Sequence, residues 1–260
     1  GFAANAKGVV SDVDDSRKHR AADVAIYGDL RAALAALAAA AAGTPRRDTW
    51  LEKLRQAEAA SRRRDAKITE SDSAPIHPAR LIAEVERFSD PDAIFVGDGG
   101  DFVSFAGRLL ERPRPGLWID PGPYGCLGSG PAYAMAAKLA HPDRQVILLA
   151  GDGAFGFSAM EFDTMVRHRI PVVCVIGNNG IWALEKHPMM SLLGVSIAAD
   201  LGPRTRYDKV VEALGGYGEL VERPDQIGPA LERAFRSGLP ACINTICDPD
   251  AEYPRSSVLM

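Results

Sequence analysis

The sequence lacks the features that mark disulfide-rich, zinc-binding, membrane-spanning and secreted proteins. Its four cysteines form no CxxC pair and no Cys/His array with zinc spacing, which favours buried free thiols at Cys174 and Cys242. No apolar run reaches the ~18 residues of a transmembrane helix. The start, Gly1 to Asn5, has neither the charge nor the apolar core of a signal peptide. We therefore expect a protein of the reduced cytoplasm with no membrane partner.

Basic residues are not in excess either. The formal net charge is -4, and the cluster Arg62–Arg64 lies beside Glu58 and Asp65, as on a solvated helix face. A nucleic-acid-binding protein usually has a basic face, so this charge argues against DNA or RNA as a partner. The remaining composition, 47% hydrophobic with 25 Gly and 18 Pro, is ordinary for a globular α/β protein.

The first 42 residues contain too few elements to form a domain of their own. Two short apolar runs, Gly8–Val10 and Val24–Ile26, and an alanine-rich helix over Leu30–Ala42 fit a small β-α-β-α piece. Asp29 is placed to cap that helix. Because so little structure cannot bury a core, we expect residues 1–42 to belong to a domain whose remainder lies upstream.

A charged segment, residues 43–75, follows this piece. Thr44-Pro45 is typical of a helix start, and Ser71 to Pro75 is typical of a helix break. The segment therefore predicts a linker helix between two domains.

Residues 76–260 alternate between strand and helix patterns. The predicted strands are mostly continuous apolar runs, as expected for parallel strands covered on both faces: Ala93–Val96, Val146–Ala150, Pro171–Ile176, Glu219–Val221 and Ala241–Ile246. Amphipathic patterns predict helices over Ala79–Phe88, Ser129–Leu139, Ala159–Arg169, Lys209–Leu214 and Ile227–Ser237. The alternation predicts an α/β fold, a doubly wound parallel sheet with helices on both faces.

Two loops after neighbouring predicted strands carry oxygen ligands. Asp152 follows the strand that ends at Ala150, and Asn179 follows the next strand. Ligands of open parallel sheets bind beyond these carboxyl ends. One carboxylate, one amide oxygen and a backbone carbonyl after Asn179 suit Mg²⁺, which takes its other ligands from phosphates and water. Glycines around Asp152 and a helix that starts near Ser158 favour a bound diphosphate.

The spacing of the two loops resembles a family signature. Asp152, within Gly-Asp-Gly, stands 27 residues before Asn179, the second residue of an Asn-Asn pair. This pattern resembles that of thiamine-diphosphate enzymes. The resemblance extends from about Ile76 to the C-terminus, as the diphosphate-binding domain of the decarboxylase and acetolactate synthase superfamily.

The resemblance implies roles for particular residues. Asp152, Asn179 and the main-chain carbonyl of Ile181 would bind Mg²⁺, with Gly180 in place of Ile181 if the turn is reshaped. Gly153 and Ala154 would contact the diphosphate.

The loop near Val96 would hold the far side of the diphosphate. Because its two aspartates, Asp98 and Asp101, would repel phosphates, we expect backbone amides to bind there, at Gly99, Gly100 and Asp101.

A glycine-rich loop upstream, residues 125–130, also matches a family pattern. Leu127 lies 25 residues before Asp152. The resemblance implies that Leu127 wedges under the cofactor and forces its V-shaped conformation, flanked by Cys126, while the Gly125 carbonyl accepts a hydrogen bond from the cofactor's amino group. The V shape makes proton removal within the cofactor intramolecular.

Two subfamilies compete for the substrate. The runs Ala154–Glu161 and Asn179–Trp182 resemble oxalyl-CoA decarboxylases and 2-hydroxyacyl-CoA lyases. Acetolactate synthases have Gln-Trp-Gln after the Asn pair, where this chain has Ala183–Met190. The leading prediction is cleavage of a 2-hydroxyacyl-CoA to a ketone or aldehyde plus formyl-CoA. A carboligase acting on pyruvate, an oxalyl-CoA-type decarboxylase and an inactive cofactor-binding homologue stay open as alternatives.

Such a lyase must remove a hydroxyl proton, which favours a general base beside the cofactor. Glu185 is the candidate catalytic base, with a surface or capping role as the alternative. Trp182 would contact the pyrimidine or the acyl group, with core packing as an equal alternative.

The predicted site is incomplete within this chain. In the superfamily, a glutamate from a separate pyrimidine-binding domain, normally of the neighbouring subunit, contacts the cofactor, and nothing in residues 1–75 resembles that domain. The resemblance therefore implies a homodimer or homotetramer, and a chain that is inactive alone. Residues 1–42 resemble instead the C-terminal remnant of the superfamily's central Rossmann-like domain. Because that domain binds ADP or the CoA nucleotide in acyl-CoA members, the resemblance implies ADP or a CoA nucleotide as a further ligand.

Overall fold

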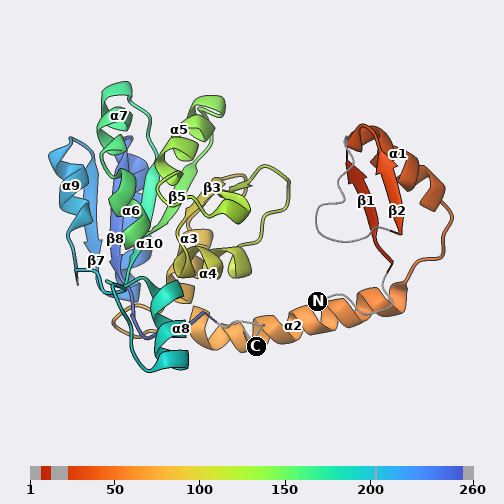
Figure 1. The fold of residues 1–260 in the computed structure, drawn as a ribbon. Helices are drawn as coiled ribbons and strands as arrows, with labels where there is room; N and C mark the ends of the chain where they lie inside the picture. Colours follow the sequence, from red (N-terminus) through yellow and green to blue (C-terminus); the bar gives the residue numbers. More distant parts are fainter. Residues whose placement is uncertain (1–6, 13–22, 203, 254–260) are drawn as a thin grey trace. The chain divides into compact units, whose positions relative to one another are not determined.

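The computed structural model describes residues 7–12, 23–202 and 204–253 (Figure 1). Contacts divide the chain into two compact units, Gly1–Ala60 and Ser61–Met260. The division falls within helix α2 (Asp48–Thr69). This helix lies inside the predicted linker but begins three residues after Pro45. The predicted domain boundaries at residues 42 and 75 stay predictions.

The first unit contains a parallel pair of strands and a helix. Strand β1 (Val9–Asp12) pairs with β2 (Val24–Tyr27), and helix α1 (Leu30–Ala41) follows. As predicted, Asp29 caps this helix. Residues 13–22, between the two strands, lie outside the described residues, and the first helix of the predicted β-α-β-α pattern would fall there.

Helix α1 has no buried residue, and its leucines Leu30, Leu34 and Leu37 are exposed. The described part of this unit therefore has no buried core of its own.

The second unit is built on six parallel strands in the order β4-β3-β5-β6-β8-β7. The strands are β3 (Ile94–Asp98), β4 (Trp118–Ile119), β5 (Val146–Gly151), β6 (Val173–Asn178), β7 (Tyr217–Val221) and β8 (Ala241–Ile246). The helices are α3 (Pro78–Arg87), α4 (Asp101–Leu109), α5 (Gly130–Ala140), α6 (Asp152–Ser158), α7 (Glu161–His168), α8 (Ala183–Leu193), α9 (Tyr207–Ala213) and α10 (Pro224–Ser237), with a short 3-10 helix η1 (Gly122–Tyr124).

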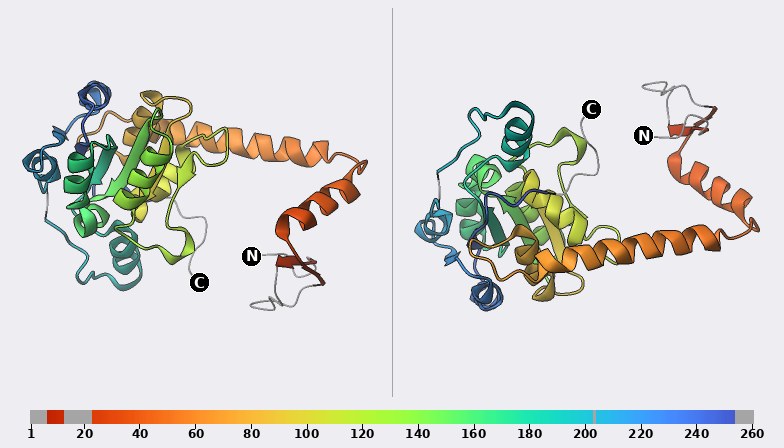
Figure 2. Two further views of the ribbon diagram at one scale, coloured as in Figure 1. Left: turned by 90° about the horizontal axis from the view of Figure 1, so that it is seen from above. Right: turned by 90° about the horizontal axis from the view of Figure 1, so that it is seen from below.

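Helices cover both faces of the sheet, which confirms the predicted doubly wound fold (Figure 2). Along β5, Ile147 and Leu149 belong to the core beneath α3, α4 and α10, whereas Val146, Leu148 and Ala150 belong to the core beneath α5, α6, α7 and α9. Because strand side chains alternate between faces, a continuous apolar run fills both cores at once. Cys174 and Cys242 are buried free thiols, as predicted.

The elements that were not predicted from the sequence are β4, α4, α6, α8 and the 3-10 helix η1. The helix predicted over Ala159–Arg169, with its start near Ser158, corresponds to α7. A separate helix, α6, begins at Asp152 and ends at Ser158, so the helix start at the Asp152 loop is that of α6. Gly153 and Gly156 lower the helix propensity of this segment. Burial of Ala154 and Phe155, each 1% exposed, stabilises the helix despite that propensity.

The order of the strands creates a crevice between β3 and β5. The chain leaves β3 through α4 toward the edge strand β4, but leaves β5 through α6 and α7 toward β6 on the other side. Two neighbouring parallel strands whose connections diverge in this way leave room for a ligand beyond their carboxyl ends. The candidate site is expected at this point.

No helix in the described part of the chain is both long enough and apolar enough to cross a membrane.

The contact between α9 and β7 gives a test of this packing. A Cβ added at Gly218 in β7 would lie 2.2 Å from the backbone oxygen of Asp208 in α9, whereas one added at Gly107 in α4 meets nothing within 4 Å. We expect Gly218→Ala to lower the free energy of unfolding by about 1–3 kcal/mol. Gly107→Ala should leave it unchanged or raise it by up to about 1 kcal/mol. Urea unfolding of both variants measures the difference, and equal stabilities would contradict the packing described.

Candidate functional site

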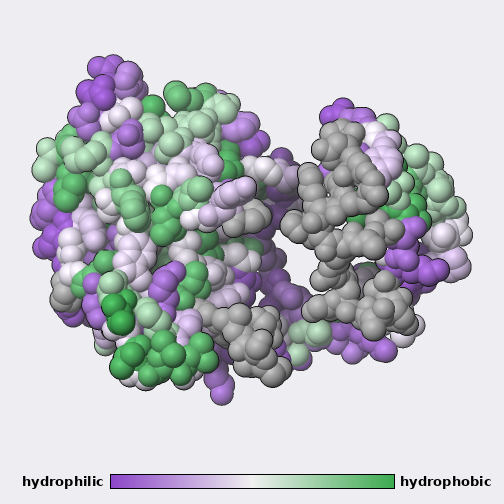
Figure 3. Space-filling view, viewed as in Figure 1, coloured by the Kyte–Doolittle hydropathy of each residue, from purple (hydrophilic) through white to green (hydrophobic). Residues whose placement is uncertain are grey.

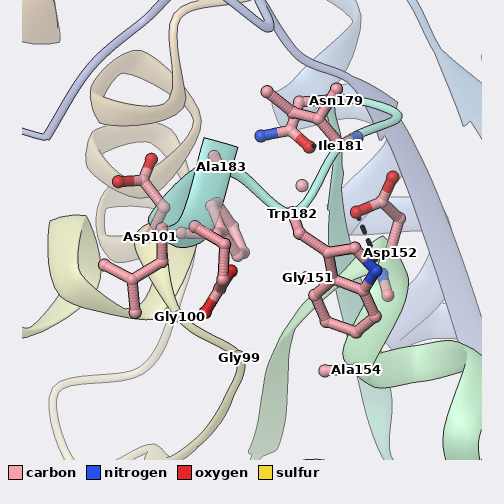
Figure 4. A pocket seen from close by; sticks show the side chains of 15 residues that line it. Gly99, Gly100, Asp101, Gly151, Asp152, Ala154, Asn179, Ile181, Trp182 and Ala183 are labelled. Atoms are coloured by element: carbon pink, nitrogen blue, oxygen red, sulfur yellow. Dashed lines mark hydrogen bonds between the residues drawn. The ribbon is translucent and has the colours of Figure 1, made fainter. Parts of the chain in front are cut away.

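A pocket lies at the carboxyl ends of β3, β5 and β6 (Figure 4). Three segments supply most of its lining: Gly99–Phe102 after β3, Gly151–Ala154 at the start of α6, and Ile181–Glu185 leading into α8, together with Asn179. The two oxygen-bearing loops predicted from the sequence therefore meet in one pocket with the loop after β3, at the point where the sheet connections diverge.

Asp152 joins the two loops through its carboxylate. One oxygen accepts a hydrogen bond of 2.8 Å from the Gly180 N–H, across the pocket, and the other accepts one of 3.0 Å from the Gly153 N–H. The side chain is only 3% exposed. Burial raises the pKa of Asp152 to about 6, although the hydrogen bonds from Gly180 and Gly153 act in the opposite direction.

Asn179 forms a tight turn after β6. Its side-chain oxygen accepts a hydrogen bond from the Ile181 N–H at 3.2 Å. Gly180 has a φ of +71°, a left-handed conformation that favours glycine. The Gly180 carbonyl accepts a hydrogen bond from the Leu201 N–H at 2.8 Å. Because that carbonyl is already engaged, the turn favours Ile181 over Gly180 as the source of a main-chain ligand.

The donor chemistry of the pocket fits a hard cation beside phosphates. Within the described residues, no three His, Cys, Asp or Glu side chains cluster to hold a metal by themselves. The pocket instead offers the carboxylate of Asp152, the amide oxygen of Asn179 and the neighbouring backbone. A protein set this small matches Mg²⁺, which keeps near-octahedral geometry and completes it with phosphate oxygens and water.

Glycines bring backbone close together on the floor of the pocket. A Cβ at Gly99 would lie 3.1 Å from the Gly151 nitrogen, so the loops after β3 and β5 touch there. A Cβ at Gly153 would lie 2.5 Å from the Trp182 ring. Trp182 thus lies over the predicted diphosphate loop, between that loop and Asn179 (Figure 4). Its contact with the pyrimidine or the acyl group stays a prediction.

The residues of the loop after β3 have two different environments. Gly99, Gly100 and Asp101 line the pocket. Asp98 is fully buried and does not line it, and its carboxylate accepts hydrogen bonds from the Gly128 and Gly130 N–H groups. The sequence analysis predicted that the whole loop faces the diphosphate. It did not predict that the Asp98 side chain points toward Gly128 and Gly130 instead.

The predicted wedge segment packs beside the C-terminal end of α6 and does not line the pocket. Gly125, with a φ of +59°, and the exposed Cys126 follow η1, and Leu127 is half-buried. A Cβ at Gly128 would lie 2.7 Å from the Phe157 Cβ in α6. The roles of Gly125, Cys126 and Leu127 toward the cofactor stay predictions.

Helix α8 carries the candidate base to the edge of the pocket. Glu185 is exposed in the first turn of α8 and lines the pocket. A Cβ at Gly100 would lie 3.0 Å from the Leu184 side chain, so α8 also packs on the loop after β3. The sequence missed this contact because α8 itself was not predicted. Beyond Glu185 the helix leads to exposed apolar residues, Leu192, Leu193, Val195 and Ile197 (Figure 3).

Only the second residue of the Asn pair faces the pocket. Asn178 is 2% exposed, and its amide donates to the Thr205 carbonyl and to Asn244 Oδ1, each at 3.0 Å. Asn244 in turn donates to the Asp208 carboxylate at 3.1 Å. This buried network fixes the end of β6 against the segment before α9, and so supports the Asn179 turn from behind.

Comparisons with known proteins agree with this geometry. The family model "Thiamine pyrophosphate enzyme, C-terminal TPP binding domain" matches residues 98–245. The chain is 54% identical to the acetolactate synthase large subunit IlvG of Mycobacterium tuberculosis, over 99% of this chain and 47% of that protein. It is 36% identical to 2-hydroxyacyl-CoA lyase 2 of Homo sapiens, over 85% of this chain and 36% of that protein.

A solved structure is also similar, the thiamine diphosphate-dependent 4-hydroxybenzoylformate decarboxylase of Rhodococcus jostii RHA1. The TM-score is 0.65 at 28% identity, and the match covers 70% of this chain and 34% of that chain.

The fold, the pocket and these similarities define an enzyme of the thiamine-diphosphate-dependent superfamily. The chain belongs to the thiamine pyrophosphate enzyme family, and residues 98–245 match its C-terminal TPP binding domain. The predicted family and fold class are thereby confirmed. The chain spans less than half the length of the two curated relatives named above.

The buried carboxylate of Asp152 should make cofactor binding depend on pH. With a pKa of about 6, the group is protonated at lower pH and must release its proton before it can bind a cation. We expect the affinity of the intact gene product for thiamine diphosphate with Mg²⁺ to rise with pH up to about 6 and then to level off. Calorimetric titrations at a series of pH values measure this.

The Asp152→Asn variant is the matched control, because the phosphates of the ligand also titrate near this pH. The ratio of wild-type to variant affinity isolates the carboxylate, and should fall about tenfold for each pH unit below the pKa of Asp152. A ratio that stays constant across that range would show that proton release from Asp152 is not part of binding.

Proposed function

We propose that the pocket holds thiamine diphosphate through Mg²⁺, with Asp152, Asn179 and the main-chain carbonyl of Ile181 as the protein ligands. The observation that carries this is the hydrogen bond from the Gly180 N–H to the Asp152 carboxylate, which brings both oxygen-bearing loops to one point. Gly153 and Ala154 then contact the diphosphate at the start of α6, because the N-terminus of a helix favours an anion. Backbone amides of Gly99, Gly100 and Asp101 contact its far side.

The reaction we propose is cleavage of a 2-hydroxyacyl-CoA to a ketone or aldehyde plus formyl-CoA. The resemblance of Ala154–Glu161 and Asn179–Trp182 to acyl-CoA members of the superfamily supports it, as does the 36% identity to 2-hydroxyacyl-CoA lyase 2. An oxalyl-CoA-type decarboxylase is supported by the same runs of residues and by nothing further. The intact Asp152 and Asn179 pair argues against an inactive homologue.

A second candidate is an acetolactate synthase-type carboligase acting on pyruvate, a 2-oxo acid. The 54% identity to a protein named acetolactate synthase, over nearly the whole chain, favours it. We expect the two candidates to differ in the segment from Ile181 to Met190, because it leads from the metal turn into α8 and its first five residues, Ile181 to Glu185, line the pocket. This segment lacks the Gln-Trp-Gln of acetolactate synthases.

Each candidate uses the residues of the pocket in the same way. When bound, thiamine diphosphate supplies a carbon nucleophile for a carbonyl group and an electron sink for the bond that breaks. Leu127 and the Gly125 carbonyl set the conformation of the cofactor. Trp182 covers the diphosphate loop and contacts the pyrimidine or the acyl group. In the lyase reaction, Glu185 also accepts the hydroxyl proton of the 2-hydroxyacyl-CoA from the edge of the pocket.

A complete site requires a second domain. We propose that a pyrimidine-binding domain outside this chain supplies a glutamate to the cofactor, in a homodimer or homotetramer located in the cytoplasm. The exposed apolar residues at the end of α8 support a covering partner, because contiguous apolar patches mark interaction surfaces. We also propose ADP or a CoA nucleotide as a ligand of the domain to which residues 1–42 belong.

Parallel assays separate the two candidates. The intact gene product, supplied with thiamine diphosphate and Mg²⁺, is given a 2-hydroxyacyl-CoA in one reaction and pyruvate in another. We expect formyl-CoA and an aldehyde or ketone from the first, and little acetolactate from the second. Acetolactate formed without cleavage of the CoA ester would overturn the lyase and establish the second candidate.

Replacement of Glu185 tests the proposed base. Glu185→Gln keeps the size of the side chain but removes its proton affinity, so we expect kcat to fall by about 100- to 10,000-fold. Glu232→Gln, an exposed glutamate on α10, is the control and should retain wild-type turnover. Near-normal kcat in Glu185→Gln would remove this residue as the base.

A further inference from the structure

A carboxylate outside the pocket is buried completely and binds only a short stretch of backbone. Asp98, the last residue of β3, is 0% exposed. Both of its oxygens lie near the Gly128 nitrogen, at 3.0 and 3.1 Å, and one lies 2.8 Å from the Gly130 nitrogen. Burial raises the pKa of Asp98, and these two backbone donors oppose that rise. A buried carboxylate is costly unless its hydrogen bonds are satisfied, so the partner segment must stay in place.

The segment held in this way carries the predicted wedge. Leu127 immediately precedes Gly128, and the Ser129 hydroxyl donates to the Cys126 carbonyl at 2.9 Å, which closes the turn. The turn is also confined sterically. A Cβ at Gly130 would lie 2.5 Å from the Asp98 Cβ, and one at Gly128 would lie 2.7 Å from the Phe157 Cβ. The turn therefore lies between the end of β3 on one side and α6 on the other.

Asp98, which binds the turn, also directly precedes residues that line the pocket. Asp98 in β3 pairs with Ala150 in β5. The residues that follow them, Gly99 and Gly151, also lie close together. Its main chain continues into Gly99 and Gly100, which line the pocket. One residue thus connects the loop proposed to hold the diphosphate with the turn proposed to shape the rest of the cofactor.

We propose that Asp98 is a positioning residue, whose carboxylate fixes the Leu127 turn at the place where it bends the cofactor. This inference rests on the proposed function, since it takes thiamine diphosphate as the ligand and Leu127 as the wedge. It assigns Asp98 no contact with cofactor or substrate. A carboxylate suits the task because both oxygens accept, so it can serve two N–H groups of one turn.

Asp98→Asn is the direct test. The amide has almost the same size, but it offers one acceptor oxygen and turns an NH₂ group toward a backbone N–H. In the cofactor-free protein, we expect amide hydrogen exchange of the segment around Gly128 and Gly130 to accelerate by about 10- to 100-fold, since hydrogen bonds to a charged group are lost. With thiamine diphosphate and Mg²⁺ bound, we expect exchange of the proton at the cofactor's C2 to slow by about tenfold or more, because this step needs the bent conformation.

Binding affinity separates this role from a general loss of structure. Asp98 does not touch the diphosphate, so the calorimetric Kd for thiamine diphosphate with Mg²⁺ should change by less than about threefold. Asp65→Asn is the matched control, because the Asp65 carboxylate accepts two hydrogen bonds from Arg108, at 2.8 and 3.0 Å, away from the wedge turn. That variant should leave both exchange rates and the Kd unchanged.

Gly130→Ala keeps the carboxylate but displaces the turn from it, and should reproduce the slow C2 exchange. The Gly130→Ala variant tests the proposal if Asp98→Asn does not fold. Normal C2 exchange in either folded variant would overturn the proposal, and failure of both variants to fold would also do so, since the role would then be structural. Absence of thiamine diphosphate binding in the wild-type protein would instead refute the proposed function itself.

Discussion

The hydrogen bond between the Asp152 carboxylate and the Gly180 N–H holds the candidate site together. It joins the start of α6 to the turn after β6, two segments that are 28 residues apart in the sequence. Burial makes this carboxylate costly to ionise, and its pKa of about 6 reflects that cost. A bound cation would relieve it, because opposite charge favours the ionised form. The same burial that disfavours the ionised carboxylate thus favours a metal ion beside it.

The surrounding fold serves to keep these two loops in register. Parallel pairing of β5 with β6 places Gly151 beside Gly177, so both loops begin at the same edge of the sheet. Behind the second loop, Asn178 and Asn244 share the Thr205 carbonyl as acceptor. In front of the first loop, the Gly99 backbone touches Gly151. Rigid strands and buried hydrogen bonds behind the loops are what a preorganised phosphate and metal site requires.

The sequence predicted the parts of the site that depend on local order. Asp152 and Asn179 could be placed in one pocket because each follows an apolar run, and the carboxyl ends of parallel strands meet at one edge. The direction of side chains at those strand ends was less predictable. Asp98 and Asn178 each stand next to pocket residues, yet both point into buried polar contacts instead. Their direction depends on the alternation of each strand and on its last paired residue, which a sequence locates only within a few residues. Helices α6 and α8 were not predicted because glycines in α6 and a proline in α8 lower the local helix propensity. Tertiary packing therefore determines that these segments are helical.

The same geometry separates the residues that hold the cofactor from those that could select the substrate. Asp152 and Asn179 are placed to hold a cofactor, but they contact nothing that would distinguish one carbonyl substrate from another. The segment from Ile181 to Met190 runs from the metal turn along α8, and differences between relatives in this segment are the place to look for substrate choice.

The central claim, that Asp152 and Asn179 hold the diphosphate of thiamine diphosphate through Mg²⁺, is tested most directly by calorimetry on the intact gene product. Thiamine diphosphate is titrated with and without Mg²⁺ into the wild type, Asp152→Ala, and Asp163→Ala as a control on α7 outside the pocket. Tight binding that needs Mg²⁺, persists in Asp163→Ala and weakens by about 100-fold or more in Asp152→Ala is the predicted result. Binding that is equally tight without Mg²⁺, or unchanged in Asp152→Ala, would contradict it.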